Sequence, residues 1–439
     1  MLSYFRIQNY RSILDMKVDF SYAEGKAPNN YNELSKMPFL KVSTKGKKNR
    51  FVPCLVIYGA NASGKTNIFK AMSNYVWLLN ESGISYSYFP NLLNRQYCST
   101  AFELELFVGK DKYRHLIEYD GREIIKEELF KNDSSVYRID NTPDKLHRSF
   151  NQLKNEQYDE EKLKSVLDIE CCEKEGEKYL QKRVFFSVIA KNYPGLSGDV
   201  TTAFNRYNNN IFIYSSNDMT KEVLKKYNDL IEANSKIESE IIDRLSSLIR
   251  NFDIDILKVK PVKEHIPVSG TQGNYFGQYR SEKILYRRYD RIKTFHKAIN
   301  GREEVFDMFH DESNGTNVLF SLLDVVLLAL DLGLTIVVDE LDKSLHPFIV
   351  AEIIKMFKSK EYNKKNAQLI FTTHCADILD MDILRVSEVG FVSKNIKEGS
   401  KIRRISDFED ESGSKIRNTA DFRKLYFNGA FGCIPFPYI

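Results

Sequence analysis

The sequence predicts an α/β protein in which a core of parallel strands adjoins an antiparallel β region and carries a mostly helical insertion. Three observations lead to this prediction. The apolar run 52–57 leads into G-x-x-x-x-G-K-T at residues 59–66, and helical spacing of apolar residues follows. Two later apolar runs, 334–338 and 368–372, end in polar residues, as parallel strands do beside a ligand. Residues 102–119 alternate apolar and polar side chains around a turn, which is typical of antiparallel strands.

The loop after the first apolar run has the composition of a phosphate cradle. It consists of Gly59, Ala60, Asn61, Ala62, Ser63, Gly64, Lys65 and Thr66. Glycines let backbone N–H groups turn inward on phosphate oxygens, and the following helix points its partially positive end at the same place. Lys65 supplies a mobile positive charge, and the Thr66 hydroxyl can ligate Mg²⁺. A chance match is the alternative, but both flanks have the right periodicity, so we expect a nucleotide site.

Length and composition set the limits on fold and location. The 439 residues allow about three domain-sized units, and a hydrophobic content of 42% suffices for a large core. The net charge of +4 argues neither for nor against nucleic acid. Six cysteines without a C-x-x-C pair favour reduced thiols. The first residues lack a secretory signal pattern, and the apolar segment 318–330 is too short to span a bilayer. We therefore expect a cytoplasmic protein without membrane contact, and a buried core helix at 318–330.

The order of patterns along the chain predicts three regions. Residues 1–140 hold the phosphate loop and strands at 2–7, 16–20 and 102–119. Residues 141–304 turn to charged, helix-favouring sequence and form the predicted insertion, although 252–261 has the pattern of a strand. Within it, 279–297 interleaves aromatic and basic residues; we favour a strand with a solvated face and keep nucleic-acid contact as the alternative. Residues 305–439 complete the core.

The third region contains a second set of candidate site residues. The strand at 334–338 runs into Asp339 and Glu340, and Asp342 follows. Adjacent carboxylates at the end of a buried strand suit phosphate chemistry, because one can hold Mg²⁺ and the other can orient the attacking water. The strand at 368–372 leads to His374, whose place at a strand's carboxyl end suits contact with a γ-phosphate.

The ordered motifs resemble a known family. GANASGKT, ESNGT, IVVDELDKSLHP and QLIFTTH look like the ABC-type ATPase head shared by SMC and RecF proteins. NYRSI near the start and the closing YFNGAFGCIPFPYI resemble, more narrowly, the AAA-family anti-phage ATPases of the AbiLi/RloA type, which are related to the ATPase subunit of PARIS. The resemblance covers about residues 1–130 and 305–439, whereas the middle is matched only by its position.

The resemblance implies roles for individual residues. It makes Asp339 a metal-binding acid, Glu340 the catalytic base and His374 the switch histidine, with Lys65 and Thr66 on the phosphates and Mg²⁺. Further residues would bind ATP, in this chain or across a dimer: Arg11, Gly59, Asn61, Ala62, Ser63, Gly64, Asn67, Ser313, Gly315 and Asp342. The signature ESNGT lacks the tandem glycines of transporter heads. The glutamine of the Q-loop is not identified, because Gln152, Gln157 and Gln181 all lack a convincing context.

The function that the resemblance implies is an ATP-hydrolysing sensor and scaffold in phage defence. We expect an ATP-sandwich dimer or a higher oligomer that controls a separate toxic effector, a nuclease, in response to a phage protein. Residues 375–439 are too few for an appended nuclease domain, and the acid pairs at 253/255 and 380/382 lack the rest of a nuclease site. The alternative is an SMC/RecF-like DNA-repair ATPase that acts on DNA directly, so DNA contact stays open. A transporter ATPase is disfavoured by the large insertion and the ESNGT signature.

Overall fold

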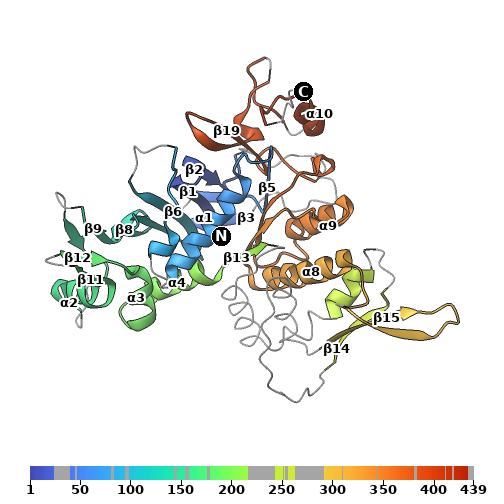
Figure 1. Ribbon diagram of the computed structural model, residues 1–439, viewed down its shortest axis with the longest axis horizontal. Coiled ribbons are helices and arrows are strands. Elements are labelled where there is room, and N and C mark those ends of the chain that lie inside the picture. The colour runs from blue at the N-terminus through green and yellow to red at the C-terminus, as the bar shows by residue number, and fades with distance from the viewer. Residues whose placement is uncertain are drawn as a thin grey trace.

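The fold is organised by one large mixed sheet (Figure 1). The computed structural model describes residues 1–23, 40–44, 47–80, 84–93, 98–142, 146–153, 158–175, 178–215, 243–250, 252, 256–262, 291–308, 310–343, 345–379, 383–410, 412–417 and 420–433. Among these residues, thirteen strands form the sheet in the order β10-β9-β8-β7-β6-β1-β2-β20-β19-β5-β18-β17-β13. The α/β class predicted from the sequence is confirmed.

One half of the sheet is built from nine of the described strands, which pair with one another in antiparallel fashion. Its strands are β1 (Leu2–Tyr10), β2 (Ile13–Asp19), β6 (Thr100–Val108), β7 (Asp111–Tyr119), β8 (Ile124–Lys131), β9 (Ser134–Asp140), β10 (His147–Ser149), β19 (Val389–Asn395) and β20 (Gly399–Arg404). The alternation that predicted β6 and β7 appears as their pairing, with Phe102 opposite Ile117. His115 of β7 is buried, and its Nδ1 lies 2.8 Å from the Tyr75 hydroxyl, so it packs in the core.

The other half of the sheet is parallel. It consists of β5 (Cys54–Gly59), β18 (Gln368–Thr372), β17 (Thr335–Asp339) and β13 (Ile211–Ser215), with β19 pairing in parallel on the outer side of β5. Parallel strands bring their carboxyl ends to the same edge of a sheet. The end of β18 therefore lies between the end of β5, which begins the phosphate loop, and the end of β17, which begins the acidic turn.

Helices cover both faces of this parallel half. Helices α1 (Lys65–Leu79), α3 (Phe185–Asn192) and α4 (Gly198–Asn209) pack into one core, together with Ile57 and Val337 from the sheet. Helices α8 (Asn314–Leu332) and α9 (Pro347–Lys358) pack into the other core, together with Val56 and Val338. Neighbouring residues of one strand thus serve opposite faces, as the two-residue period of a strand requires. Strands buried on both sides explain the uninterrupted apolar runs in the sequence.

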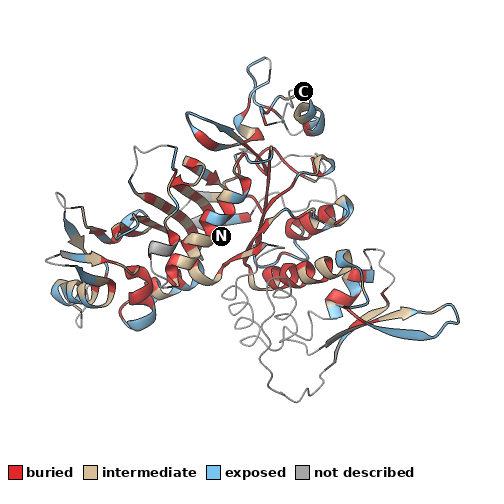
Figure 2. Cartoon of the chain, in the orientation of Figure 1, coloured by how far each residue is buried: buried red, intermediate tan, exposed pale blue. Residues whose placement is uncertain are grey.

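Smaller elements surround the sheet. They are β3 (Leu40–Thr44), β4 (Lys47–Phe51), η2 (Ile84–Ser87), α2 (Glu160–Val166), η4 (Leu167–Cys171), β11 (Cys172–Glu175), β12 (Lys178–Gln181), β14 (Lys258–Val262), β15 (Arg291–Lys297), β16 (Glu303–Asp307), η5 (Ala376–Ile378), η6 (Ile405–Asp407) and α10 (Phe422–Phe427). Strands β14, β15 and β16 form a separate sheet, which projects beside α8 and is mainly exposed along β16 (Figure 2).

The predicted insertion, residues 141–304, is less separate than the sequence suggests. Its described part holds helices α2, α3 and α4 but also strands, and β13 enters the main sheet in parallel with β17. Of the expected strand at 252–261, only the end is seen, within β14; residues 253–255 lie outside the described residues, as does 279–290 of the aromatic–basic stripe. The boundaries at 140/141 and 304/305 stay predictions.

The apolar segment at 318–330 lies within α8. By length and composition this helix could cross a membrane, but most of its apolar side chains are buried against the sheet. It is the core helix that the sequence predicts.

Candidate nucleotide-binding site

The carboxyl ends of three neighbouring strands bring the candidate residues together. Strand β5 leads into Lys65, β17 leads into Asp339 and Glu340, and β18, which lies between them, leads into His374. Burial lowers the pKa of Lys65, and the carboxylates of Asp339 and Glu340 partly offset this effect by raising it. The positive charge and the two acids, far apart in the sequence, therefore act on one another in the fold.

The phosphate loop is held in a conformation that few residues can adopt. Gly64, the residue before α1, has φ +109°, and an added Cβ would lie 2.7 Å from the Ser12 Oγ and closer still to the Ser400 Oγ. Any side chain at this position would be strained and would collide with both serines. The second glycine of the motif is thus required by close packing, in addition to any contact with phosphate.

A chain of hydrogen bonds fixes this loop to two other parts of the fold. The Asn67 Nδ2 donates to the Ser12 Oγ (2.8 Å), the Ser12 and Ser400 hydroxyls are 2.8 Å apart, and the Ser400 Oγ donates to the Ser63 carbonyl (2.6 Å). Because a carbonyl can only accept, the single Ser400 proton points to the loop and Ser12 donates to Ser400. The turn after β1 and the start of β20 therefore hold the loop together.

The loop residues fit a bound triphosphate. The Lys65 Nζ donates to the carbonyls of Gly59 (2.8 Å) and Ala60 (3.0 Å), so its ammonium lies inside the loop. The Ser63 Oγ is buried, and within the described part of the chain it has no hydrogen-bond partner. An unpaired buried hydroxyl is costly unless a ligand or water completes it. Thr66 is exposed at the start of α1, where its hydroxyl can ligate Mg²⁺.

The two acids after β17 differ in exposure and in backbone conformation. Asp339 is partly buried, and its Oδ1 accepts a hydrogen bond from the Thr372 Oγ1 (2.7 Å). Glu340 is exposed and has φ +55°, a left-handed conformation that costs a side chain about 1 kcal/mol. Its N–H donates to the same Thr372 hydroxyl (2.7 Å). A strained backbone conformation persists only where the surrounding structure enforces it, and such conformations are common at functional sites.

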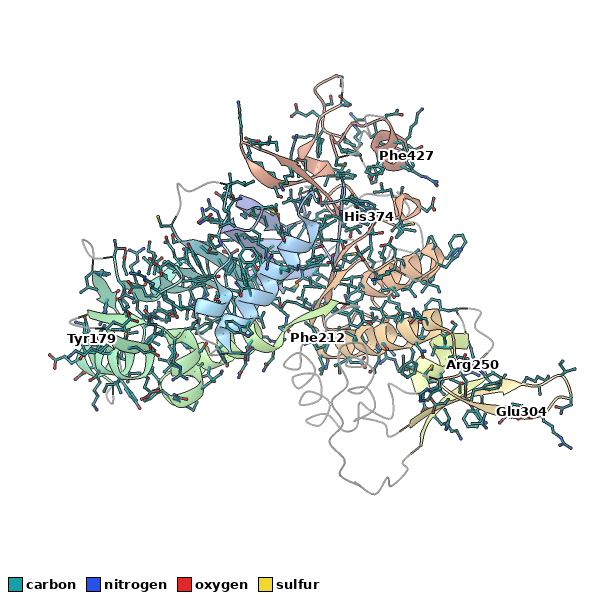
Figure 3. All side chains as sticks on the ribbon, viewed as in Figure 1. Tyr179, Phe212, Arg250, Glu304, His374 and Phe427 are labelled. Atoms are coloured by element: carbon teal, nitrogen blue, oxygen red, sulfur yellow. The ribbon has the colours of Figure 1, made fainter. Side chains whose placement is uncertain are left out.

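The next turn joins Asp342 to the end of β18. The His374 N–H donates to the Asp342 Oδ2 at 3.4 Å, while the buried Asp342 Oδ1 lacks a partner among the described residues. The Tyr58 hydroxyl donates to the Cys375 carbonyl (3.0 Å). His374 is exposed and is labelled in Figure 3, and shortly after it Asp377 forms an ion pair with Arg423 of α10 (2.7 Å). Asp342 and His374 thus lie at the same edge as the phosphate loop.

Arg11 lies beside the site and follows an unusual turn. Its φ is +49°, its N–H donates to the Phe89 carbonyl (2.8 Å), and its guanidinium lies 4.6 Å from the centre of the Phe89 ring. A cavity of about 280 Å³ lies next to this turn, lined by Ser12, Leu14, Asn91, Leu93, Lys394, Asn395, Ile396 and Gly399. Ser12, which contacts both the loop and this cavity, links the two.

The signature residues lie apart from the loop, at the start of α8. Ser313 is the N-cap: its Oγ accepts from the Thr316 N–H (3.2 Å), and both Ser313 and the first turn with Gly315 are accessible. The residue before it, Glu312, accepts from the Thr294 Oγ1 (2.5 Å) and lies 2.6 Å from the His296 Nε2. Strand β15 of the projecting sheet is thereby tied to the signature element.

Sequence reasoning missed several of these contacts. It did not single out Thr372, Ser400 or Glu312, although Thr372 lies in the QLIFTTH motif and Glu312 in ESNGT. The residues that they contact are distant in the sequence, so these contacts become visible only when the order of the strands in the sheet is known. Of the glutamines considered for the Q-loop, Gln181 is buried and donates to Glu127 (2.8 Å), far from the loop in the sheet order. Gln152 makes a turn next to β9, and Gln157 lies outside the described residues.

The strand–loop–helix unit and the acidic turn two strands away define the class of P-loop nucleotide-binding proteins. Within that class, the chain belongs to the family described as "AAA domain, putative AbiEii toxin, Type IV TA system", whose model matches residues 54–380. Members of such AAA families are nucleotide-binding ATPases. The matched range begins at β5 and ends after β18, so it contains the phosphate loop, the ESNGT element, the two acids and His374.

Solved structures similar to the chain are SMC heads. One is the SmcHead bound to the C-winged helix domain of ScpA (TM-score 0.42, 13% identity, 92% of this chain and 96% of that chain). Another is the SMC head domain from Thermotoga maritima (0.40, 13%, 92% and 98%). A third is the Smc head with an extended coiled coil bound to the C-terminal domain of ScpA from Pyrococcus furiosus (0.40, 11%, 92% and 95%). No curated protein matches the chain significantly.

Proposed function

We propose that this chain hydrolyses ATP in a Mg²⁺-dependent reaction. The observation that carries the proposal is the convergence of Lys65, Asp339 and Glu340 at the carboxyl ends of β5 and β17, two parallel strands separated only by β18, where burial lowers the pKa of Lys65 and the charges of the two acids raise it. Membership of an AAA family supports it. The cavity beside Ser12 suits the nucleoside, because it adjoins the loop at the side where α1 begins.

Each residue has a role that follows from its position. Lys65 leaves the loop carbonyls to neutralise the phosphates, and the N–H groups at the start of α1 bind their oxygens. Thr66 and Asp339 are the residues that would hold Mg²⁺, which neutralises charge on the phosphates when bound. We assign to the exposed Glu340 the removal of a proton from the attacking water, and to the exposed His374 the contact with the γ-phosphate.

The test is phosphate release by the purified chain with and without Mg²⁺. We expect Glu340→Gln to bind ATP but to lose turnover by about 10²–10⁴-fold, because the base is removed while its shape is kept. Lys65→Ala should weaken ATP binding itself. Glu361→Gln, at an exposed position after α9, is the matched control. Equal turnover by the wild type and Glu340→Gln would refute the assignment of the base.

The active form that we propose is a dimer in which each ATP is held between the loop of one copy and the signature of the other. Ser313 and the first turn of α8 form an accessible helix N-terminus, which favours an anion. In a mixture of Lys65→Ala and Ser313→Arg chains, a mixed dimer retains one intact site although each pure variant has none. We therefore expect mixing to restore activity that both pure variants lack.

The controls for this experiment separate assembly from folding. Ser134→Arg, in an exposed position at the start of β9, should leave activity unchanged in pure form. Light scattering should show ATP-dependent dimers for Glu340→Gln. A pure Ser313→Arg preparation with full ATPase activity would show that no second copy contributes to the site.

We further propose that hydrolysis controls a separate toxic effector in phage defence, with a phage protein as trigger, in the cytoplasm. The family description names a putative toxin of a type IV toxin–antitoxin system, which supports a role in a two-component system; the separation of the toxic effector from this chain is our own inference. The link from β15 to Glu312 offers a route by which a bound effector could sense the signature. Expressed alone, the chain should be harmless and should cleave neither DNA nor RNA. Nuclease activity that persists through purification and is lost in Lys65→Ala would contradict the separate effector.

A further inference from the structure

The hydroxyl of Thr372 connects both acids of the candidate site. Thr372 is the last residue of β18 and is fully buried. Its Oγ1 accepts from the Glu340 N–H (2.7 Å) and lies 2.7 Å from the Asp339 Oδ1. The Leu341 N–H also donates to the Thr372 carbonyl (3.1 Å). A backbone N–H can only donate and a hydroxyl has one proton, so the proton of Thr372 must point to Asp339.

This arrangement determines how each acid is presented. The bond to Oδ1 fixes the Asp339 carboxylate and leaves its Oδ2 for another partner. The bond to the Glu340 N–H holds a residue whose φ is +55°, and the turn directs the Glu340 side chain into solvent. A second link joins the same two segments, because the His374 N–H donates to Asp342 (3.4 Å). The end of β18 therefore acts as the template for the acidic turn.

We propose that Thr372 is a positioning residue for hydrolysis: its single hydroxyl orients the metal-binding Asp339 and the base Glu340 together. This inference rests on the proposed ATPase function. Because Thr372 is fully buried, it offers no surface to a nucleotide, so its loss should change the chemical step and the metal requirement more than the affinity for ATP. A misplacement of catalytic groups by about 1 Å can lower the rate by about 10²-fold.

The decisive comparison is between Thr372→Val, which keeps the shape but removes the hydroxyl, and Thr372→Ser, which keeps the hydroxyl. We expect Thr372→Val to lower kcat by about 10²-fold with little change in the KM for ATP. Thr372→Ser should retain most of the wild-type kcat. Thr335→Val makes the same exchange at the opposite, amino end of β17 and serves as the control for a buried threonine. Thermal unfolding reports whether each variant is folded.

A second measurement does not depend on turnover. Mn²⁺ binding in the presence of ATP, followed by electron paramagnetic resonance, should weaken at least several-fold in Thr372→Val, while binding of a fluorescent ATP analogue without metal stays as in the wild type. A wild type without ATPase activity would remove the proposed function, yet the Mn²⁺ comparison would still test the link to Asp339. Unchanged kcat and unchanged Mn²⁺ affinity in Thr372→Val would overturn the inference. So would a folded Thr372→Ser that is as impaired as Thr372→Val.

Discussion

Replacing Lys358 with methionine should destabilise the fold in a pH-dependent manner, because it leaves the Glu388 carboxyl buried without its counter-charge. The two side chains are 1% and 0% exposed, and the Lys358 Nζ lies 2.6 Å from the Glu388 Oε2. The same oxygen accepts from the Arg385 N–H (2.9 Å), and the Glu388 carbonyl accepts from the Val56 N–H (2.8 Å) at the start of β5. The pair therefore joins the end of α9 to the sheet that carries the phosphate loop.

The size and sign of the effect follow from the proton balance. Burial raises the pKa of Glu388 above its ordinary 4.5, and Lys358 is the main charge that opposes the rise. Without Lys358, the folded state keeps Glu388 protonated at a pH where the unfolded state has released the proton. Stability is then lost as pH rises above 4.5, by about 1.4 kcal/mol per unit while the folded carboxyl stays protonated. Near neutral pH the loss reaches about 3–5 kcal/mol, the usual cost of breaking a buried pair.

The assay is urea unfolding at several pH values between 5 and 8. Lys358→Met should lose stability steadily with rising pH, relative to the double variant Lys358→Met with Glu388→Gln. The double variant lacks the buried carboxyl that causes the slope, so its stability should not show it. A loss in Lys358→Met that is the same at both ends of the pH range would show that packing, and not the unpaired carboxyl, causes it.

Three further predictions concern single positions. Gly333 follows α8 with φ +71°, and a Cβ added there would lie 2.5 Å from the Lys365 carbonyl oxygen. We therefore expect Gly333→Ala to lower the free energy of unfolding by more than the roughly 1 kcal/mol that backbone strain alone costs. An unchanged Tm would contradict this expectation. Burial raises the pKa of Cys433 to about 12, so maleimide at pH 7.5 should label the exposed Cys98 before Cys433. Equal labelling rates of the two cysteines, measured by mass spectrometry, would refute the burial of Cys433. Ser400→Ala removes one hydrogen bond to the loop and should weaken ATP binding about 5-fold by calorimetry; unaltered affinity would count against the bond's role.

Local patterns predicted the elements that are buried on both faces. The periodicity of apolar side chains can be read from a single sequence. It predicted the apolar run of β5, the helix α1 and the apolar segment within α8. The same reasoning found the phosphate loop and the acids, because each follows a strand and has a distinctive residue type. The assigned roles of these residues stay predictions, since geometry alone does not report turnover.

Pairings between distant segments could not be predicted in this way. Strand β13 has an ordinary apolar pattern, and nothing in residues 211–215 states that they pair with residues 335–339 of β17. Lys358 and Glu388 similarly look like surface residues in the sequence, although both are buried. Charged side chains are usually exposed to solvent. They are buried where an oppositely charged side chain from another part of the fold pairs with them. Tertiary context decided these positions.

The arrangement of the site suggests where its control would act. Strand β5, which leads into the phosphate loop, belongs to the same hydrogen-bonded sheet as Asp339 and Thr372, so these parts cannot be displaced separately without breaking strand pairs. Ser313 instead begins α8, and the preceding Glu312 is held by β15 of the exposed sheet. A partner bound to that sheet would reach the signature through Glu312 and through the two hydrogen bonds between Asp307, at the end of β16, and Asp311. In the proposed dimer that signature serves the nucleotide of the other copy, so such a partner would regulate hydrolysis across the interface rather than in the chain to which it binds.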